Sequence, residues 1–180
     1  DEITFTAQIY EPPLQYHYLK RPYEVIAATA VEVPKPRYVD DKGQPLPDDA
    51  DPAKIAYSDY LIRLRPGIRY QPHPAFAEPP ASLAGIETLA DFPNWGTREL
   101  VAEDYVYAIK RLAHPRLHSP ILGLMSEYIV GLDDFAKTLQ ARKSAVAERR
   151  DEWLDLRRFP LAGVEAVDAH TYRIRVKGKY

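Results

Sequence analysis

Residues Tyr57 to Arg65 alternate between apolar and polar side chains with a period of two. One set of alternate positions holds Tyr60, Ile62 and Leu64, and the other holds Leu61, Arg63 and Arg65. This alternation is typical of a strand that has one face in a core and the other in water, and Pro66-Gly67 ends it with a turn. The segment therefore predicts a half-buried β-strand.

A helix is predicted after a loop, over residues 100–112. Its apolar residues recur at helical spacing and are expected to face the core: Val101, Tyr105, Ala108, Ile109 and Leu112. Glu103, Lys110 and Arg111 are left for solvent. Val101 stands where a capping residue is expected, but its side chain cannot accept a hydrogen bond from a first-turn N–H. We therefore expect Thr97 or backbone groups to cap this helix.

Further extended segments lie on both sides of the helix. Leu14–Tyr18 is short, aromatic and strand-like, and Val33–Asp40 contains two prolines, which favours a sheet edge. Asp41-Lys-Gly43 is a suitable turn, so we expect Val33–Asp40 and the strand at Tyr57–Arg65 to pair antiparallel. Val164–Val176 is expected to form a strand or a hairpin that turns near Asp168-Ala169. Its inward residues would be Tyr172, Ile174 and Val176.

Several helices complete the expected architecture. Short helical segments are predicted at Asp1–Tyr10, which Pro12-Pro13 ends, and at Val25–Ala30. A longer helix is expected to start at Ser119-Pro120 and to end or bend at Gly131, and another is expected over Asp133–Arg150. Strands come first, then helices, then strands again. This order predicts an α+β fold with a mainly antiparallel sheet.

The composition limits the class of protein. A chain of 180 residues with an apolar fraction of 46% suits one folded domain, residues 1–180. A net charge of −2 gives no support to nucleic-acid binding. The chain has no cysteine, which excludes disulfides and thiolate catalysis. Residues 70–97 contain five prolines and predict a long surface excursion, with one turn near Leu83–Leu89.

The sequence offers little support for catalysis or for a metal site. The five histidines are dispersed, at His17, His73, His114, His118 and His170. His114 and His118 have a ligand spacing, but the prolines nearby indicate a loop, and no carboxylate lies between the two. The adjacent carboxylates, such as Glu103-Asp104, fit helix starts and charged faces. We therefore expect no enzymatic activity, no cofactor and no bound metal.

Four segments, in order, resemble the extracellular solute-binding proteins of bacterial ABC importers, of the oligopeptide, dipeptide and nickel type. They are Gln8-Ile-Tyr-Glu-Pro-Pro-Leu14, Tyr60-Leu-Ile-Arg-Leu-Arg-Pro-Gly-Ile-Arg-Tyr70, Val101-Ala-Glu-Asp-Tyr-Val-Tyr-Ala-Ile-Lys-Arg111 and Gly163-Val-Glu-Ala-Val-Asp-Ala-His-Thr-Tyr-Arg-Ile-Arg-Val176. The chain departs from that family at Gln71-Pro-His-Pro74, where an Asp-Gly turn is usual, and at Val101, where a threonine is usual. It is also shorter than the family's two-lobed proteins.

The resemblance implies that the chain is an N-terminal piece of one lobe of a periplasmic binding protein, with the second lobe absent. It implies reversible capture of a peptide or other small solute and delivery to an ABC permease in the inner membrane, by a monomer in the periplasm or outside the cell. The residues that it places at the ligand are Tyr10 and Glu11. Arg63, Arg65 and the pair Lys110-Arg111 are alternative partners for a ligand carboxylate, or the solvent side of their own elements.

The first part of the chain is rich in tyrosine, with Tyr10, Tyr16, Tyr18 and Tyr23 close together. Tyrosine combines apolar area with a polar tip and suits binding surfaces, but it also fills half-buried sheet faces. The alternative function is a structural or protein-interaction module that retains the family's fold without binding a ligand.

Overall fold

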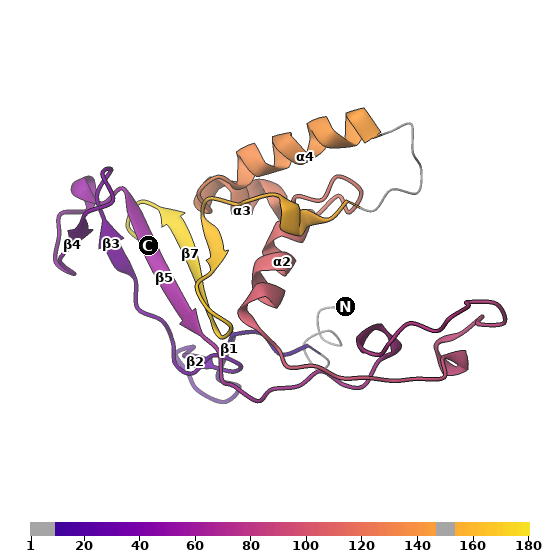
Figure 1. Cartoon of the computed structure of the whole chain (residues 1–180). Coiled ribbons are helices and arrows are strands. Elements are labelled where there is room, and N and C mark those ends of the chain that lie inside the picture. Colours follow the sequence, from indigo (N-terminus) through magenta and orange to yellow (C-terminus); the bar gives the residue numbers. More distant parts are fainter. Residues whose placement is uncertain (1–9, 147–153) are drawn as a thin grey trace. The chain divides into compact units, whose positions relative to one another are not determined.

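The structure, a computed structural model, describes residues 10–146 and 154–180 (Figure 1). Its chain divides into two compact units. One unit combines the residues up to Leu64 with Val101–Tyr180, and the other is Arg65–Leu100. Of the helix expected at Asp1–Tyr10, all but Tyr10 lies outside the described residues, as does the end of the helix expected at Asp133–Arg150.

The first unit is built on a five-stranded antiparallel sheet with the strand order β4-β3-β5-β7-β6. The strands are β3 (Arg37–Val39), β4 (Pro45–Leu46), β5 (Tyr57–Arg63), β6 (Val164–Ala166) and β7 (Thr171–Lys177). The helices are α2 (Ala102–Leu112), α3 (Leu122–Tyr128) and α4 (Leu132–Val146), with short 3-10 turns at η1 (Pro52–Lys54) and η4 (Leu156–Arg158). Helix α2 packs against β6 and β7. This architecture confirms the α+β class.

The predicted pairing of the first two long extended segments is confirmed. Strand β3 runs antiparallel to β5, with Tyr38 opposite Ser58. The Asp40 carboxylate accepts hydrogen bonds from the N–H groups of Lys42 and Gln44, at 2.9 and 2.7 Å, and so fixes the turn. This turn leads into β4, which pairs with the outer side of β3. The expectation that Val33–Asp40 lies at the sheet edge is therefore wrong, because β4 takes that position.

The inward faces of the two long strands are also confirmed. Strands β5 and β7 pair with Ile62 opposite Tyr172, and these side chains are 5% and 2% exposed. The turn near Asp168-Ala169 joins β6 to β7, and the Val167 N–H donates to the Thr171 carbonyl at 2.8 Å. Because the period of a strand is two residues, the charged alternate positions must lie on the opposite face.

Helix α2 presents a different face from the predicted one. Its buried residues are Ala102, Val106 and Lys110, whereas Ala108 is exposed. Tyr105 and Ile109 are half-buried and pack against the edge of the core. The apolar stripe is thus displaced by about one residue, and the assignment of Lys110 to solvent is wrong. A lysine can lie there because its four methylene groups pack as apolar surface.

Asp104 and backbone groups cap helix α2. The Asp104 carboxylate accepts from the Val101 N–H at 3.0 Å, and the Ala102 N–H donates to the Ala169 carbonyl at 2.8 Å. The Thr97 hydroxyl donates instead to the Tyr70 carbonyl within the second unit. The expectation of a backbone cap is confirmed, whereas Thr97 does not serve as the cap.

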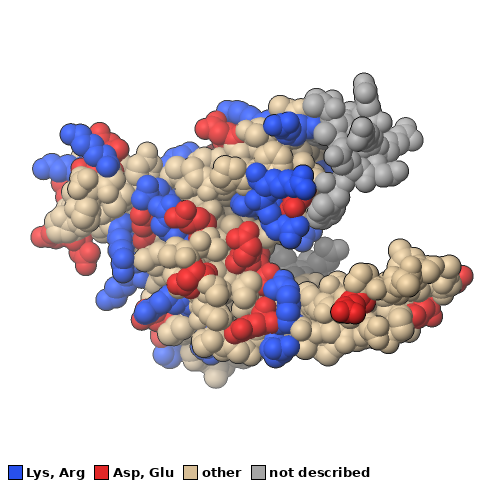
Figure 2. Space-filling view, in the orientation of Figure 1, with Lys and Arg blue, Asp and Glu red and all other residues tan. Residues whose placement is uncertain are grey.

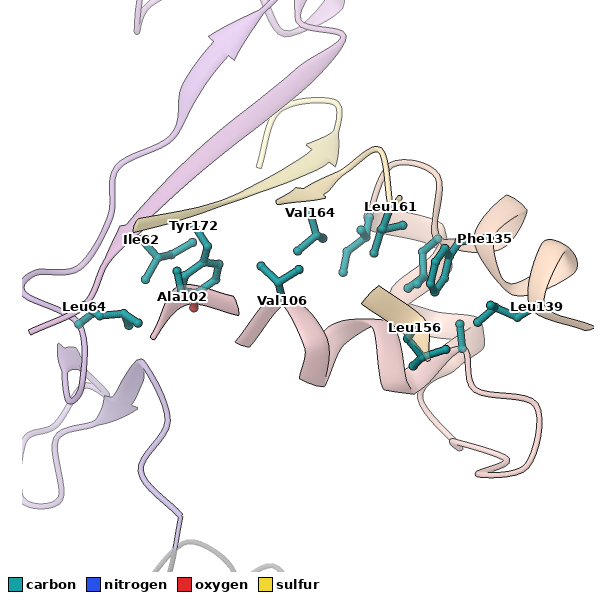
Figure 3. Close-up of a cluster of buried hydrophobic side chains, with 14 residues drawn as sticks. Ile62, Leu64, Ala102, Val106, Phe135, Leu139, Leu156, Leu161, Val164 and Tyr172 are labelled. Atoms are coloured by element: carbon teal, nitrogen blue, oxygen red, sulfur yellow. The ribbon is translucent and has the colours of Figure 1, made fainter. Parts of the chain in front are cut away.

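The core lies between the sheet and the helices, and Figure 3 shows part of it. Its fully buried members include Leu132 and Leu139 of α4, Leu156 of η4 and Val164 of β6. Gly131, with φ of 77°, separates α3 from α4, as predicted. This backbone conformation suits glycine, because a side chain would be strained there.

Near the start of the described chain, β1 (Leu14–Tyr16) pairs antiparallel with β2 (Val25–Ala27). The strand at Leu14–Tyr18 is confirmed, but the helical turn predicted at Val25–Ala30 is wrong. Two β-branched residues, Val25 and Ile26, favour a strand, and pairing with β1 satisfies their backbone groups.

The second unit consists of Arg65–Leu100 and contains η2 (Pro74–Phe76) and η3 (Leu89–Asp91). Its two ends pair through isolated antiparallel bridges, Arg69 with Glu99 and His73 with Gly96. The Ile86 N–H donates to the Leu83 carbonyl at 3.1 Å, which confirms the predicted turn at Leu83–Leu89. Within the described residues of both units, no helix has the length and apolar character needed to cross a membrane.

Candidate functional site

Tyr10 and Glu11 are the residues that the resemblance places at a ligand. Both side chains are open to solvent, and Tyr10 is 70% exposed. They precede Pro12-Pro13, which leads into β1. Solvent access to both side chains is a requirement for contact with a ligand. A second requirement for a preorganised contact is that the backbone carrying them is held in place.

The backbone at this point is held by hydrogen bonds to two other elements. The Tyr105 hydroxyl, from α2, donates to the Glu11 carbonyl at 3.1 Å. It also lies 2.6 Å from the Thr29 hydroxyl, which follows β2. The Thr29 hydroxyl also lies 3.2 Å from the Pro12 carbonyl. Each hydroxyl has a single proton, so when Tyr105 donates to Glu11, the Thr29 proton is shared between the Tyr105 oxygen and the Pro12 carbonyl. The Thr29 N–H donates to the Pro12 carbonyl at 3.2 Å.

Tyr105 is itself fixed by packing. Its ring stacks on that of Tyr172, with 5.5 Å between ring centroids. Burial raises the pKa of Tyr105 more than its hydrogen bond with Thr29 lowers it. Burial also raises the pKa of Tyr172, and the neighbouring Tyr105 adds to this effect. Tyr105 therefore keeps its proton at neutral pH and can donate it to the Glu11 carbonyl. The result is a fixed backbone that presents two solvated side chains.

The alternative partners for a ligand carboxylate have different surroundings. Arg63 forms an exposed ion pair with Glu32, and both side chains are about 60% exposed. Lys110 is 6% exposed and belongs to the buried stripe of α2, whereas Arg111 is exposed. Because Lys110 and Arg111 face different environments, they do not form a solvated pair of cations. Arg65 belongs to the second unit.

A cluster of charges crosses the polar face of the sheet and was missed by sequence reasoning. Arg175 donates two hydrogen bonds of 2.7 Å to the Asp59 carboxylate, and Arg173 lies 3.7 Å from the same group. Arg173 also pairs with Glu165 at 2.9 Å. Burial would raise the pKa of Asp59, but its hydrogen bonds with Arg175 and the charges of both arginines outweigh this and lower it.

These charges tie β5, β6 and β7 together, and the cations are largely neutralised by their partners. The Arg173 Nε is buried without a hydrogen-bond partner among the described residues. The signal that would have revealed the cluster is the alternation of charges on β5 and β7, but it becomes useful only once the two strands are known to pair. We regard the cluster as a structural feature, because each arginine is already paired with a carboxylate of a neighbouring strand.

Two open grooves lie beside α3. One, of about 500 Å³, is lined by Leu122, Gly123, Ser126, Glu127, Asp133, Ala136 and Lys177. The other, of about 280 Å³, includes His114 and His118. Tyr10 and Glu11 line neither groove. Among the described residues, no three histidine or carboxylate side chains gather in a way that would hold a metal ion.

Comparison of the chain with protein-family models, with curated proteins and with solved structures found no match.

Proposed function

We propose that this chain is part of the solute-binding component of an ABC importer. In this proposal it contributes one wall of a cleft between two lobes, which binds a peptide or related solute reversibly and delivers it to a membrane permease. The place of action would be the periplasm or the cell exterior. The proposal is supported by the order of the four segments that resemble the family and by the α+β architecture.

The observation that carries the proposal is the contrast between a fixed backbone and free side chains at Tyr10 and Glu11. A binding site gains affinity when its groups are held in place before the ligand arrives, since less conformational freedom is lost on binding. Tyr10 would supply apolar area and a hydroxyl, and the Glu11 carboxylate would accept N–H groups or an ammonium group of a peptide.

Binding would be completed by closure of a second lobe over the solute. A ligand that contacts both lobes favours the closed form by the difference in its affinity for the two forms. One wall buries only part of a ligand, whereas established pockets bury most of it. We therefore expect residues 1–180 alone to bind peptides more weakly than about 1 μM, which corresponds to about 8 kcal/mol of binding free energy.

The test uses the protein that the intact gene encodes, purified and titrated with a mixed peptide library by calorimetry. Native mass spectrometry of the same sample would detect a solute that co-purifies. Tyr10→Ala or Glu11→Gln should weaken binding about tenfold, or 1.4 kcal/mol. Tyr18→Ala and Glu24→Gln remove the same chemical groups from the connection between β1 and β2 and should leave the affinity for the peptide unchanged.

Two results would contradict the proposal. Sub-micromolar binding by residues 1–180 alone would place the whole site within this chain and remove the need for two lobes. Equal affinity losses from the Tyr10 and Tyr18 variants would show that the fixed segment is not the ligand wall.

The second candidate is a protein-interaction module, and the tyrosines of the β1–β2 hairpin favour it. Tyr16, Tyr18 and Tyr23 are each more than two-thirds exposed. Tyr16 and Tyr23 contact each other edge to face, and the Arg21 guanidinium lies 4.3 Å from the Tyr23 ring centroid. Tyrosine and arginine are enriched among residues that dominate protein interfaces. Under this candidate, the intact gene product would bind no solute.

A further inference from the structure

The second unit begins as a paired ribbon. The Tyr70 N–H donates to the Arg98 carbonyl at 3.0 Å, and the Leu100 N–H donates to the Ile68 carbonyl at 2.8 Å. Further along, the His73 and Gly96 backbones exchange two hydrogen bonds, at 2.8 and 3.2 Å. A Cβ atom at position 96 would lie 2.1 Å from the carbonyl oxygen of Phe76. The two ends of the unit are therefore held close together by backbone contacts.

Residues 74–97, which we call the acidic segment, continue from this ribbon and have an ordered backbone of their own. One oxygen of the Asp91 carboxylate accepts from the N–H groups of Glu87 and Thr88, at 3.1 and 2.7 Å, and from the Thr88 hydroxyl at 3.0 Å. These bonds lower the pKa of Asp91, the backbone bond from Thr88 most strongly. Asp91 thus stays ionised near neutral pH and fixes the turn around Thr88.

The acidic segment exposes large apolar side chains although its backbone is held. Leu83 is 68% exposed, Leu89 is 53% exposed and Trp95 is 49% exposed. Trp95 contacts the His73 ring, at 6.2 Å between centroids. Covering apolar groups on an ordered surface segment with a partner lowers the free energy, because the groups leave water. Aromatic residues are enriched in such contacts.

The charge of the acidic segment is of one sign. It contains Glu78, Glu87 and Asp91 but no lysine or arginine. Figure 2 shows red carboxylates among tan residues over this segment, at the lower right, and no blue groups. Two arginines of the ribbon contact the base of the segment: the Arg98 guanidinium lies 5.2 Å from the Phe76 ring centroid, and Arg69 donates to the Thr97 carbonyl at 3.1 Å. Away from that base the carboxylates are the only ionic side chains, and they favour cationic over anionic partners.

We propose that the acidic segment is a docking surface for a partner protein whose surface carries apolar side chains beside lysines or arginines. Leu83, Leu89 and Trp95 provide the apolar contact, and Glu78 and Glu87 select a cationic partner. Charge complementarity contributes mainly to specificity and to the rate of encounter, whereas apolar burial contributes to affinity. This inference does not depend on solute binding, because all of its residues lie in the second unit.

The test titrates the 180-residue chain with a synthetic amphipathic helical peptide of leucine and lysine, by calorimetry, and repeats the titration with the leucine–glutamate counterpart. The lysine peptide should bind, and 0.5 M salt should weaken its binding. The double variant Leu83→Ser, Leu89→Ser and the double variant Glu78→Gln, Glu87→Gln should each weaken binding about tenfold. Asp91 is left unchanged because it holds the turn.

Matched controls remove the same groups from the first unit. Leu117→Ser with Leu124→Ser changes two leucines that are 48% and 56% exposed. Asp48→Asn with Asp49→Asn removes two exposed carboxylates from the loop that follows β4. Neither control should change affinity by more than about twofold, because surface substitutions away from a contact have small effects.

Four binding results would overturn the inference, and a fifth comes from sedimentation. They are absence of binding by the lysine peptide, equal losses in the acidic-segment variants and the control variants, equal binding of the glutamate peptide, and binding of phosphatidylglycerol vesicles that the Leu83/Leu89 variant abolishes. Sedimentation of the chain alone serves as a further check. Self-association that the same variant abolishes would identify a second copy as the occupant and would also overturn the inference.

Discussion

Replacement of Val106 by alanine tests how helix α2 packs. Val106 is 1% exposed and belongs to the core cluster together with Val164 and Tyr172 (Figure 3). The substitution removes two buried carbon groups. At about 0.8 kcal/mol of transfer free energy for each group, their loss costs about 1.6 kcal/mol. The unfilled space adds a further loss, because a packed core relaxes only in part. We therefore expect the free energy of unfolding to fall by about 2–3 kcal/mol.

The assay is urea denaturation of each variant, monitored by circular dichroism. Equal slopes of unfolding free energy against urea concentration would confirm that the compactness of the folded and unfolded states is unchanged. Val167→Ala is a matched control, because the same groups leave a side chain that is 56% exposed. It should cost less than about 0.5 kcal/mol. Ala108→Lys tests the opposite side of the helix and should be nearly neutral, since lysine is a good helix former.

Two outcomes would refute this reasoning. Equal losses for Val106→Ala and Val167→Ala would show that Val106 is not enclosed. A loss of several kcal/mol for Ala108→Lys would mean that Ala108 faces the core, which is the orientation that residue periodicity alone predicts.

Four further predictions concern single groups. Ile109→Asp should cost several kcal/mol by placing a carboxylate against the core, whereas Arg111→Ala should cost little; equal thermal shifts would contradict the assigned faces. Asp59→Asn should lower the free energy of unfolding at neutral pH. The difference in this free energy from the wild type should shrink as the pH falls below 3.8, because a carboxylate with a lowered pKa stabilises the folded state only while it is ionised. A difference that does not change with pH in urea titrations would refute this. Gly96→Ala should increase hydrogen exchange at His73, since its Cβ would meet a backbone carbonyl, whereas Gly123→Ala has open space and should not change it. Tyr105→Phe should cost about 1–2 kcal/mol and increase exchange around Glu11, and unchanged exchange there would show that the hydroxyl does not hold the segment.

Local patterns in the sequence were sufficient for the two long strands and for several turns, although not for β2 or β4. Alternation assigned the faces of β5 and β7 correctly because neighbouring strand residues must point to opposite sides of the sheet. The turn after β3 was also predicted correctly, since Asp40 and Gly43 satisfy it within a few residues. These features depend on interactions between residues that are close along the chain.

Features that depend on distant residues required the tertiary structure. The pairing of β5 with β7 joins residues such as Asp59 and Arg175, and no local pattern specifies which strand lies beside which. Helix α2 shows the same limit, because the charge of Lys110 indicates solvent while its methylene stem fits a buried position. Amphipathic side chains satisfy either environment, so the surrounding elements decide between them.

The candidate site combines both kinds of information. The sequence and its resemblance to solute-binding proteins selected Tyr10 and Glu11, and the tertiary structure decided that their backbone is held by Tyr105 and Thr29. Tyr105 lies on α2 and Thr29 follows β2, so the Tyr105 hydroxyl reaches the Glu11 carbonyl, and the Thr29 hydroxyl reaches the Pro12 carbonyl, only after α2 has packed against the sheet. A hydrogen bond between residues 94 positions apart depends on the folded path of the whole unit, which residue types and spacing do not encode locally.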